Sequence, residues 1–376
     1  MTQARRVRRA LRTAAARGRE RLPPAPGLRV CGYLLSEIGL GETARAYALA
    51  ARAAGIPLSG GDAPLRGRAN AREGAALVAR RRPRQAQLVV AALQDVAAVA
   101  EGFRRMPRQI ACPLWELSRV PPQRRAGLAA FDELWAPSRF VAEALREATD
   151  RPVHLVPHPL RLPEAPPPPR PSDGTLRVLT FFDTDSWAAR KNPQAAVRAF
   201  RAAFPPSRRD AALTVKLRGS SDRGERAWLA AAAAEDGRIE VIDRTLSRAE
   251  MSAMADACDV FLSLHRAEGF GLGPAEALAR ARAVVTTGYS AVTDFVTPQT
   301  GYPTPYELIA LGPDDYADPE GQVWADPSVE AAAEALRAIY DDPAEARRRG
   351  EAGFALLKRE HDLAVVGARM KALLAT

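Results

Sequence analysis

The sequence predicts an α/β protein with two doubly wound domains, each a parallel sheet covered by helices. Two observations lead to this fold class. Short apolar runs alternate with helical segments, the order that parallel sheets require. A proline-rich stretch interrupts the alternation near the middle of the 376 residues, and the alternation then starts again. At roughly 150 residues per domain, the length also suits two domains.

The first domain is expected at 27–160, with globular order beginning at Leu28. Its strands are short continuous apolar runs, as expected for strands that are buried on both faces. Its helices are rich in alanine, a strong helix former. In chain order we expect strand Leu28–Leu35, helix Glu42–Ala54, strand Gln87–Ala92, strand Glu133–Ala136 and helix Arg139–Ala148.

A stiff, extended linker is expected at 161–173, because five prolines fall between Pro163 and Pro169. The second domain is expected at 174–358. Ligands of such folds bind beyond the carboxyl ends of the strands, so we expect a cleft there. Its elements should be strand Leu176–Phe182, helix Pro193–Phe204, strand Leu213–Leu217, helix Glu225–Ala234, strand Ile239–Ile242, helix Ser247–Ala257, strand Asp259–Leu264, helix Pro274–Arg280, strand Ala283–Thr287 and helix Val329–Tyr340.

Composition excludes several classes of protein. No apolar run approaches the ~18 residues that a membrane-spanning helix needs, and the first residues lack the apolar core of a secretory signal. The three cysteines stand far apart, which argues against a disulfide framework or a structural zinc site. We therefore expect a cytoplasmic protein.

The net charge of +10 is concentrated in a basic arm at 1–26. Its first 22 residues carry eight arginines and one acid, so the rest of the chain is close to neutral. One interpretation is a solvated arm. Another is a peripheral contact with an anionic membrane at its inner face, and a third is a salt-sensitive contact with nucleic acid that would make the arm a separate binding element.

The segment Asp259–Arg280 carries the most informative pattern. A buried strand is followed by Gly269, Gly271 and Gly273 and then by a helix, an arrangement that leaves backbone N–H groups free for an anion. Glu268 and Glu276 flank the turn, with Glu276 expected in the first helical turn. Ionised carboxylates would repel a lone phosphate but accept strong hydrogen bonds from hydroxyls. The pattern thus favours a ligand with hydroxyls beside its phosphates, against the simpler interpretation of two solvated acids.

The span from Glu268 to Glu276 resembles the Glu-x7-Glu signature of retaining nucleotide-sugar glycosyltransferases of family 4, whose fold is of GT-B type. Other segments, between about 28 and 345, are similar to that family as well. They are Arg190-Lys191-Asn192-Pro193 with Phe200, Trp135-Ala136-Pro137-Ser138, Val156-Pro157-His158-Pro159-Leu160 and Trp324-Ala325-Asp326-Pro327.

The resemblance implies a role for each matching position. Glu268 would hold hydroxyls of the donor sugar, and Glu276 the donor ribose. Arg190 and Lys191 would neutralise the leaving nucleoside diphosphate, where fixed cations stabilise developing charge. The simpler alternative for this pair is an exposed basic helix start. The backbone N–H groups that would meet the sugar and diphosphate belong to Gly269, Phe270, Gly271 and Leu272.

Further residues are weaker candidates. Lys216 is either a second phosphate ligand or a solubilising residue at a strand edge, and His265 adjoins the signature loop on the donor side. Trp115 and Glu116 are expected on the acceptor side, where an aromatic ring can stack on a sugar and a carboxylate can bind its hydroxyls. The alternative for this pair is a buried tryptophan beside a surface acid.

The glycine pattern Gly39–Ala44 leaves a different class open. It could be a dinucleotide fingerprint, with Asp62 as the ribose acid, which would make the protein an NAD-type Rossmann oxidoreductase. That interpretation leaves Glu268 and Glu276 unexplained. In the glycosyltransferase interpretation, Gly39 and Gly41 let the backbone approach the donor diphosphate or the acceptor.

We therefore expect a retaining, metal-independent hexosyltransferase that needs no cofactor. It would move a mannose- or glucose-type sugar from a nucleotide-diphosphate donor to a carbohydrate or glycolipid acceptor, as in polysaccharide biosynthesis. The resemblance also implies a C-terminal helix at about 360–376 that returns to the first domain. Two departures from the family, Ala281-Arg282-Ala283 in place of a glycine turn and Ala291 in place of glycine, leave a non-catalytic sugar-nucleotide-binding paralogue as an alternative.

Overall fold

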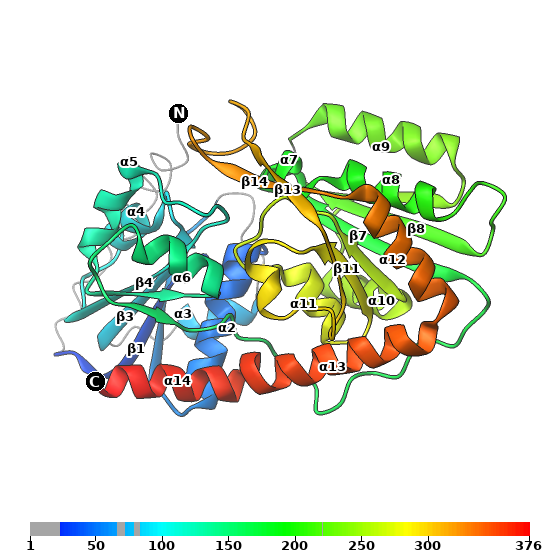
Figure 1. Cartoon of the computed structure of the whole chain (residues 1–376). Helices are drawn as coiled ribbons and strands as arrows, with labels where there is room; N and C mark the ends of the chain where they lie inside the picture. The colour runs from blue at the N-terminus through cyan, green and yellow to red at the C-terminus, as the bar shows by residue number, and fades with distance from the viewer. Residues whose placement is uncertain (1–22, 66–71, 79–82, 220) are drawn as a thin grey trace. The chain divides into compact units, whose positions relative to one another are not determined.

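The computed structural model of the chain describes residues 23–65, 72–78, 83–219 and 221–376. These residues form two compact units (Figure 1). Unit 1 ends at Leu162 and resumes at Lys358–Thr376, and unit 2 is Pro163–Leu357. Most of the predicted basic arm lies outside the described residues. Its last part does not: Ala25 already belongs to the first strand, where its N–H donates to the carbonyl of Pro83 at 3.0 Å.

Unit 1 is a parallel six-stranded sheet in the order β2-β1-β3-β4-β5-β6. Its strands are β1 (Ala25–Gly32), β2 (Leu58–Asp62), β3 (Arg84–Ala92), β4 (Arg108–Leu114), β5 (Glu133–Ala136) and β6 (Val153–Leu155). Its helical segments are α2 (Gly39–Ala53), α3 (Arg72–Val78), α4 (Val96–Glu101), α5 (Pro122–Arg125), η1 (Ala126–Ala130), α6 (Arg139–Arg146), α14 (Leu363–Ala375) and the end of α13 (Pro343–His361).

Both faces of this sheet are buried, as the continuous apolar strands predict. Leu88 and Val90 of β3 share one core cluster with Tyr47 of α2 and Met370 of α14. Val89 points to the opposite face and is equally inaccessible to solvent. The C-terminal helix thus packs within unit 1, where a Cβ on Gly367 would stand 2.1 Å from a carbonyl oxygen of α2.

Unit 2 holds a second parallel six-stranded sheet, in the order β12-β11-β10-β7-β8-β9. Its strands are β7 (Leu176–Asp183), β8 (Ala211–Arg218), β9 (Ile239–Asp243), β10 (Val260–Ser263), β11 (Ala283–Thr287) and β12 (Tyr302–Thr304). Its helical segments are η2 (Thr184–Ser186), α7 (Ala188–Lys191), α8 (Pro193–Ala203), α9 (Arg223–Glu235), α10 (Arg248–Ala257), α11 (Leu272–Leu278), η3 (Ser290–Asp294), α12 (Val329–Asp341) and most of α13.

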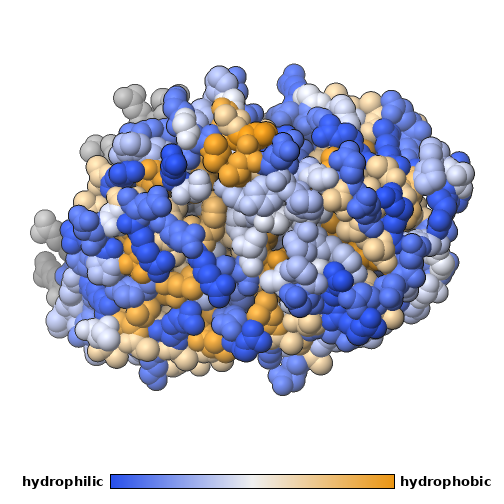
Figure 2. Space-filling view, in the orientation of Figure 1, coloured by the Kyte–Doolittle hydropathy of each residue, from blue (hydrophilic) through white to orange (hydrophobic). Residues whose placement is uncertain are grey.

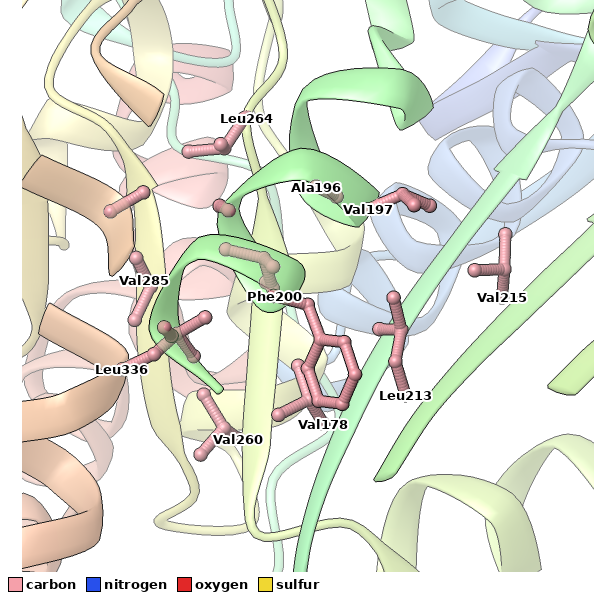
Figure 3. Close-up of a cluster of buried hydrophobic side chains, with 14 of the residues drawn as sticks. Val178, Ala196, Val197, Phe200, Leu213, Val215, Val260, Leu264, Val285 and Leu336 are labelled. Atoms are coloured by element: carbon pink, nitrogen blue, oxygen red, sulfur yellow. The ribbon is translucent and has the colours of Figure 1, made fainter. Parts of the chain in front are cut away.

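The core of unit 2 forms where α8 and α12 meet one face of the sheet. Phe200 of α8 lies among Val178, Leu213 and Val260 from three strands and Leu336 of α12 (Figure 3). The α/β fold class with doubly wound sheets is therefore confirmed. An antiparallel hairpin, β13 (Tyr306–Ala310) with β14 (Val323–Pro327), was not among the expected elements.

The surface drawn in Figure 2 mixes hydrophilic and apolar residues. Large hydrophobic side chains that are exposed include Trp187, Tyr306, Leu308 and Val365. None of the helices in the described ranges combines the length and the apolar character that crossing a membrane demands.

The turn after α11 has an unusual residue in a common motif. The N–H of Ala281 donates to the carbonyl of Leu278 at 2.9 Å, and that of Arg282 to the carbonyl of Ala277 at 3.0 Å. These are the bonds of a Schellman motif, which normally places glycine in the left-handed position. Ala281 takes that position with φ of 52°. The helix therefore ends in this motif without a glycine, because Ala281 adopts the strained conformation.

Replacing Ala281 with glycine is expected to stabilise the protein. The left-handed conformation costs an L-residue ~1–2 kcal/mol, and the buried methyl group returns about 0.8 kcal/mol. The free energy of unfolding should therefore rise by roughly 0.5–1 kcal/mol in urea denaturation. Ala283→Gly in β11 is the matched control, since it removes a buried methyl group from ordinary strand backbone and should destabilise. If Ala281→Gly and Ala283→Gly lower the free energy of unfolding equally, the backbone of Ala281 is not strained.

Two buried histidines meet in unit 1. The Nε2 atom of His158 lies 3.1 Å from Thr43 Oγ1, and His361 Nδ1 donates to the carbonyl of His158 at 3.0 Å. Burial lowers the pKa of His158 to about 4 and lowers that of His361 as well. Both rings are therefore neutral in the folded protein at neutral pH.

Acid should therefore destabilise unit 1 before its carboxylates titrate. In the unfolded chain a histidine takes up a proton near its ordinary pKa of 6.5, while folded His158 does so near 4, so the free energy of unfolding falls as pH drops between these values. For His158 alone the loss is roughly 1–3 kcal/mol. Urea denaturation at pH 7 and at pH 5 measures this fall. The free energy of unfolding should decrease less between the two pH values in His158→Asn than in the wild type. An NMR titration of the His158 ring with a midpoint near 6.5 would refute this.

Candidate active site

The backbone of Glu268 is held in place by the segment that follows β11. Its N–H donates to Ser290 Oγ at 2.9 Å, and its carbonyl accepts from the N–H of Ala291 at 3.2 Å. Ser290 is left-handed, with φ of 65°, which lets its hydroxyl and the next N–H reach the same residue. Strained backbone of this kind is enriched at functional sites. The carboxylate of Glu268 is thus presented from a rigid loop.

Two cations hold that carboxylate. Lys191 Nζ contacts Glu268 Oε1, and Arg190 Nη1 lies 3.2 Å from Glu268 Oε2. Burial raises the pKa of Glu268, but the charges of Lys191 and Arg190 outweigh it and bring the pKa to about 2. The carboxylate is therefore ionised at neutral pH, where it can only accept hydrogen bonds.

The structure separates the parts that Arg190 and Lys191 play. Arg190 is 2% exposed, and its guanidinium donates to the carbonyl of Ala267 at 2.8 Å and to Ser186 Oγ at 2.9 Å. The side chain of Lys191 is 22% exposed. Lys191 is thus the cation open to a ligand, while Arg190 holds the loop. Their interpretation as a helix start was wrong, because they end α7 and Asn192 separates them from α8.

Gly271 and Gly273, two of the glycines after Glu268, are required by packing. Gly271 has φ of 94°, and a Cβ there would lie 2.4 Å from a methyl group of Val292. A Cβ on Gly273 would lie 2.6 Å from the ring of Phe261. Phe270 packs its ring against Phe295, so only the backbone of Phe270 is a candidate ligand.

The helix α11 begins at Leu272, not at Pro274 as expected. Proline suits any position of a first helical turn, where N–H groups have no partner, so it did not mark the first residue here. Glu276 is consequently the fifth residue of the helix and lies outside its first turn, which corrects the expectation. Its side chain is half-buried.

His265 lies inside the protein. The ring is fully buried, with Nδ1 at 3.1 Å from Ser263 Oγ. Burial is the largest influence on its pKa, which is lowered to about 4. A direct contact with a donor, as expected from its place in the sequence, is not available to this ring, because no part of it reaches the surface.

Lys216 is not at a strand edge. It lies in β8 between Phe181 of β7 and Ile242 of β9, and it is 4% exposed. Burial lowers the pKa of its ammonium to about 8. The interpretation as a solubilising residue at a strand edge was therefore wrong, and the interpretation as a phosphate ligand stays a prediction.

Among the candidates in unit 1, Trp115 agrees with the alternative interpretation of a buried tryptophan. Gly39 is the first residue of α2, and Gly41 lets that helix approach its preceding loop, since a Cβ there would stand 2.3 Å from the carbonyl oxygen of Ser36. Trp115 is fully buried and its indole N–H donates to the carbonyl of Arg119 at 3.0 Å. Its ring face cannot stack on a sugar, because protein atoms cover it. Glu116 is half-buried.

The carboxylate proposed to bind a dinucleotide ribose serves the protein backbone. Asp62 Oδ1 accepts from the N–H of Leu35 at 2.9 Å, in the loop between β1 and α2. That loop spans six residues between the bounds of β1 and α2, longer than a tight dinucleotide turn needs. Both features weaken the oxidoreductase interpretation.

Three residues near Glu268 were not among the predicted site residues. Ser186 Oγ accepts a hydrogen bond from the guanidinium of Arg190, and Ser290 Oγ accepts one from the N–H of Glu268. Asn192 Nδ2 donates to the carbonyl of Leu264 at 3.0 Å. Asn192 also takes the left-handed conformation, with φ of 49°, in which asparagine is tolerated. Its place between a lysine and a helix-starting proline was the available signal. The described residues contain no group of three or more potential metal-ligating side chains.

Solved structures with the same fold are glycosyltransferases. HepE of Anabaena, in complex with UDP and glucose, superposes with a TM-score of 0.66 at 12% identity over 94% of this chain and 100% of that chain. A glycosyltransferase from Rickettsia africae gives 0.64 at 12% identity over 94% and 98%. A mutant of S. aureus TarM superposes with a TM-score of 0.57 at 8% identity. The match covers 77% of this chain and 55% of the TarM chain. At these identities the likeness shows the fold alone.

Comparison of the sequence with known families identifies the family of this chain. No curated protein is significantly similar to the chain. The model of a family described as "Family 4 Glycosyltransferase in conflict systems" matches residues 138–364. This is more than half of the chain, and it includes Arg190, Lys191, Glu268 and Glu276. The chain therefore belongs to this family of glycosyltransferases, and its two doubly wound units are those of a GT-B fold.

Proposed function

We propose that this glycosyltransferase moves a hexose of glucose or mannose type from a UDP-sugar to a carbohydrate or glycolipid acceptor, with retention of anomeric configuration. The observation that carries the proposal is the ionised Glu268 between Arg190 and Lys191. A fixed carboxylate accepts hydrogen bonds from sugar hydroxyls. The cation beside it suits the phosphates to which the same sugar is attached.

Each side chain then has a part in the reaction. Glu268 orients the donor sugar through its hydroxyls, and Arg190 keeps Glu268 in place. Lys191 faces the diphosphate and stabilises the charge that develops on the leaving oxygen, an effect that is strong in a site with little water. Lys216 and Glu276 are proposed as further contacts to the nucleotide. Cations of the chain itself thus stabilise the charge of the leaving diphosphate, as a metal ion does in metal-dependent enzymes.

Retention is proposed from the resemblance to retaining enzymes, and the poor nucleophilicity of the available carboxylate argues against a covalent glycosyl-enzyme intermediate as the route to it. Glu268 has a pKa of about 2 and is neutralised by two cations, so attack on the anomeric carbon is unfavourable. We propose that the acceptor hydroxyl attacks from the side of the leaving group and gives its proton to the departing phosphate. This step forms the new glycosidic bond as the bond to phosphate breaks.

The choice of UDP rests on proteins of the same fold. HepE has been solved with UDP-glucose, and the pneumococcal O-GlcNAc transferase GtfA with UDP and GlcNAc. These ligands are properties of those proteins. They make UDP-glucose and UDP-GlcNAc the first donors to test on this chain.

A thermal-shift screen tests the donor site. UDP, GDP, ADP, dTDP and their common sugar conjugates are compared with NADH, each at about 100 times its expected Kd, where a binding ligand adds ~2.7 kcal/mol of stability. We expect UDP and one UDP-sugar to raise the melting temperature and NADH to have no effect. A rise with NADH alone would support the oxidoreductase alternative.

Turnover separates an enzyme from a sugar-nucleotide-binding paralogue. The wild type is incubated with the stabilising donor and methyl glycosides as acceptors, and the anomeric proton of the product is followed by NMR from the first turnovers. A product with the donor's configuration is expected. Inversion would refute the mechanism, and donor binding without transfer or hydrolysis would favour the paralogue.

A further inference from the structure

Trp187 combines an exposed aromatic ring with a strained backbone. The residue immediately precedes α7 and takes the left-handed conformation, with φ of 62°. A bulky residue is a genuine outlier there, because its Cβ crowds the following carbonyl oxygen. The residue is nevertheless 40% exposed. The protein thus carries a large aromatic side chain at a position where burial in the core does not require one.

The strain of Trp187 belongs to the surroundings of Glu268. Among the described residues, six other than glycine have a positive φ, and Trp187, Asn192 and Ser290 are three of them. Ser290 binds the backbone of Glu268, and Asn192 directly follows Lys191. Strained backbone clusters at sites that hold ligands. Trp187 is the one bulky aromatic residue in this strained set.

The backbone of Trp187 has a structural part that its side chain does not share. Its carbonyl accepts the N–H of Arg190 at 3.0 Å and that of Lys191 at 3.3 Å, so the residue begins the helical turn that carries both cations. Glycine or asparagine would adopt the same backbone at a lower cost. The turn alone therefore does not account for the indole ring.

A second aromatic residue holds this ring in place. Tyr316 lies in the loop between β13 and β14 and is 5% exposed. Its ring centroid is 5.4 Å from that of Trp187, with 47° between the ring planes. Aromatic pairs at such a distance attract each other. Trp187 therefore presents a fixed aromatic surface one helical turn before Lys191, the cation that is open to a ligand.

We propose that the indole ring of Trp187 stacks on the apolar face of a sugar ring during transfer. The face of an aromatic ring is negative and does not attract a phosphate. A cationic ligand would be repelled by Lys191. A neutral pyranose carries no charge and presents C–H groups on one face. The inference rests on the proposed function, and it gives the transfer reaction a residue that lies outside the sequence motifs.

The covalent order of a nucleotide sugar favours a sugar over the nucleobase as the stacked ring. The sugar is bonded directly to a phosphate, whereas the ribose separates the base from the diphosphate. Lys191 contacts Glu268 and is proposed to face the diphosphate. The ring beside Lys191 is then a sugar. The donor sugar and the acceptor sugar both meet this requirement, because the acceptor hydroxyl attacks the carbon that is bonded to the leaving phosphate.

Acrylamide quenching of tryptophan fluorescence tests the contact on the full chain. Three of the five tryptophans, Trp115, Trp135 and Trp324, are at most 1% exposed, and Trp228 is half-buried. In the variant Trp228→Phe, quenching therefore reports on Trp187. It is measured without ligand, with UDP, with UDP-glucose or UDP-GlcNAc, and with UDP plus methyl glucoside or methyl mannoside.

We expect UDP alone to leave the quenching constant unchanged and a ligand that carries a sugar to lower it about twofold or more, because a stacked ring covers much of the exposed indole. Protection by a UDP-sugar assigns the contact to the donor sugar. Protection only by a glycoside in the presence of UDP assigns it to the acceptor sugar. Protection by UDP alone as strong as that by a UDP-sugar would show a contact with the base and overturn the inference.

Substitutions of Trp187 separate stacking from a structural role. Trp187→Asn removes the ring, and asparagine tolerates the left-handed backbone. In isothermal titration it should weaken binding of the protecting sugar ligand about tenfold or more, with the Kd of UDP unchanged. Trp187→Phe keeps an aromatic face and should lose less than about threefold. The matched control is Trp228→Phe, which removes a half-buried indole from α9 and should bind every ligand as the wild type does.

The outcomes distinguish this inference from the proposed function. If UDP does not bind to the wild type, the proposed function fails and the stacking contact fails with it. If UDP binds, the absence of protection by every sugar ligand, or an unchanged sugar affinity in Trp187→Asn, refutes the contact alone. An equal loss of affinity for UDP and for the sugar ligand in Trp187→Asn would show that Trp187 only positions Lys191, and it would also refute stacking.

Discussion

Replacing Glu268 with glutamine is expected to lower turnover by about 10²–10³-fold while the chain stays folded. The amide keeps the shape of the carboxylate but loses its charge, and removal of one fixed electrostatic contact from an active site typically has this effect. The loop should keep its course, because Ser290 and Ala291 bind the backbone of residue 268 and not its side chain.

Steady-state kinetics with the identified donor measure the effect. Stability should also fall, by roughly 1–3 kcal/mol, since Arg190 and Lys191 lose their shared counter-charge and Lys191 can turn toward solvent. Glu307→Gln on the exposed face of β13 is the matched control and should behave like the wild type. Wild-type turnover in Glu268→Gln would contradict the assignment of the donor site. Because the pKa of Glu268 is about 2, no limb of the wild-type pH profile above pH 4 should come from this residue.

Reversing the charge of Lys191 to glutamate is expected to weaken donor binding by at least about 2 kcal/mol, or roughly 30-fold in Kd. Two effects act in the same direction. The cation open to the diphosphate is lost, and a second carboxylate is placed beside Glu268. Arg190 cannot compensate, since its guanidinium is already bonded to Ala267 and Ser186.

Isothermal titration with UDP measures this prediction directly. Lys191→Met removes the charge without adding a new one and should give a smaller loss of affinity. Lys371→Glu, on the exposed surface of α14, changes the net charge by the same amount and should bind UDP as the wild type does. Equal affinity in Lys191→Glu and Lys371→Glu would show that Lys191 does not meet the diphosphate.

Local patterns in the sequence were sufficient for most elements of the fold. Strands β5 and β11 have the predicted bounds, since continuous apolar runs ended by polar or turn residues mark strands that are buried on both faces. The hairpin β13–β14 escaped prediction. Its two short strands are joined by a long loop, and their pairing depends on contacts that a local pattern does not contain.

The sequence by itself determined the α/β class and the doubly wound organisation, because those depend on periodicity. It also led to the proposal that Glu268 binds the donor, since that proposal depends on residues within one short segment. Only the tertiary structure showed that both cations contact that carboxylate and which of them is open to solvent. Lys191 and Arg190 are adjacent in sequence, yet one reaches solvent and the other is enclosed by Ser186 and Ala267. It also placed Trp115 and His265 in the interior. Burial and pairing between distant segments depend on how the chain packs, and a linear pattern does not specify them.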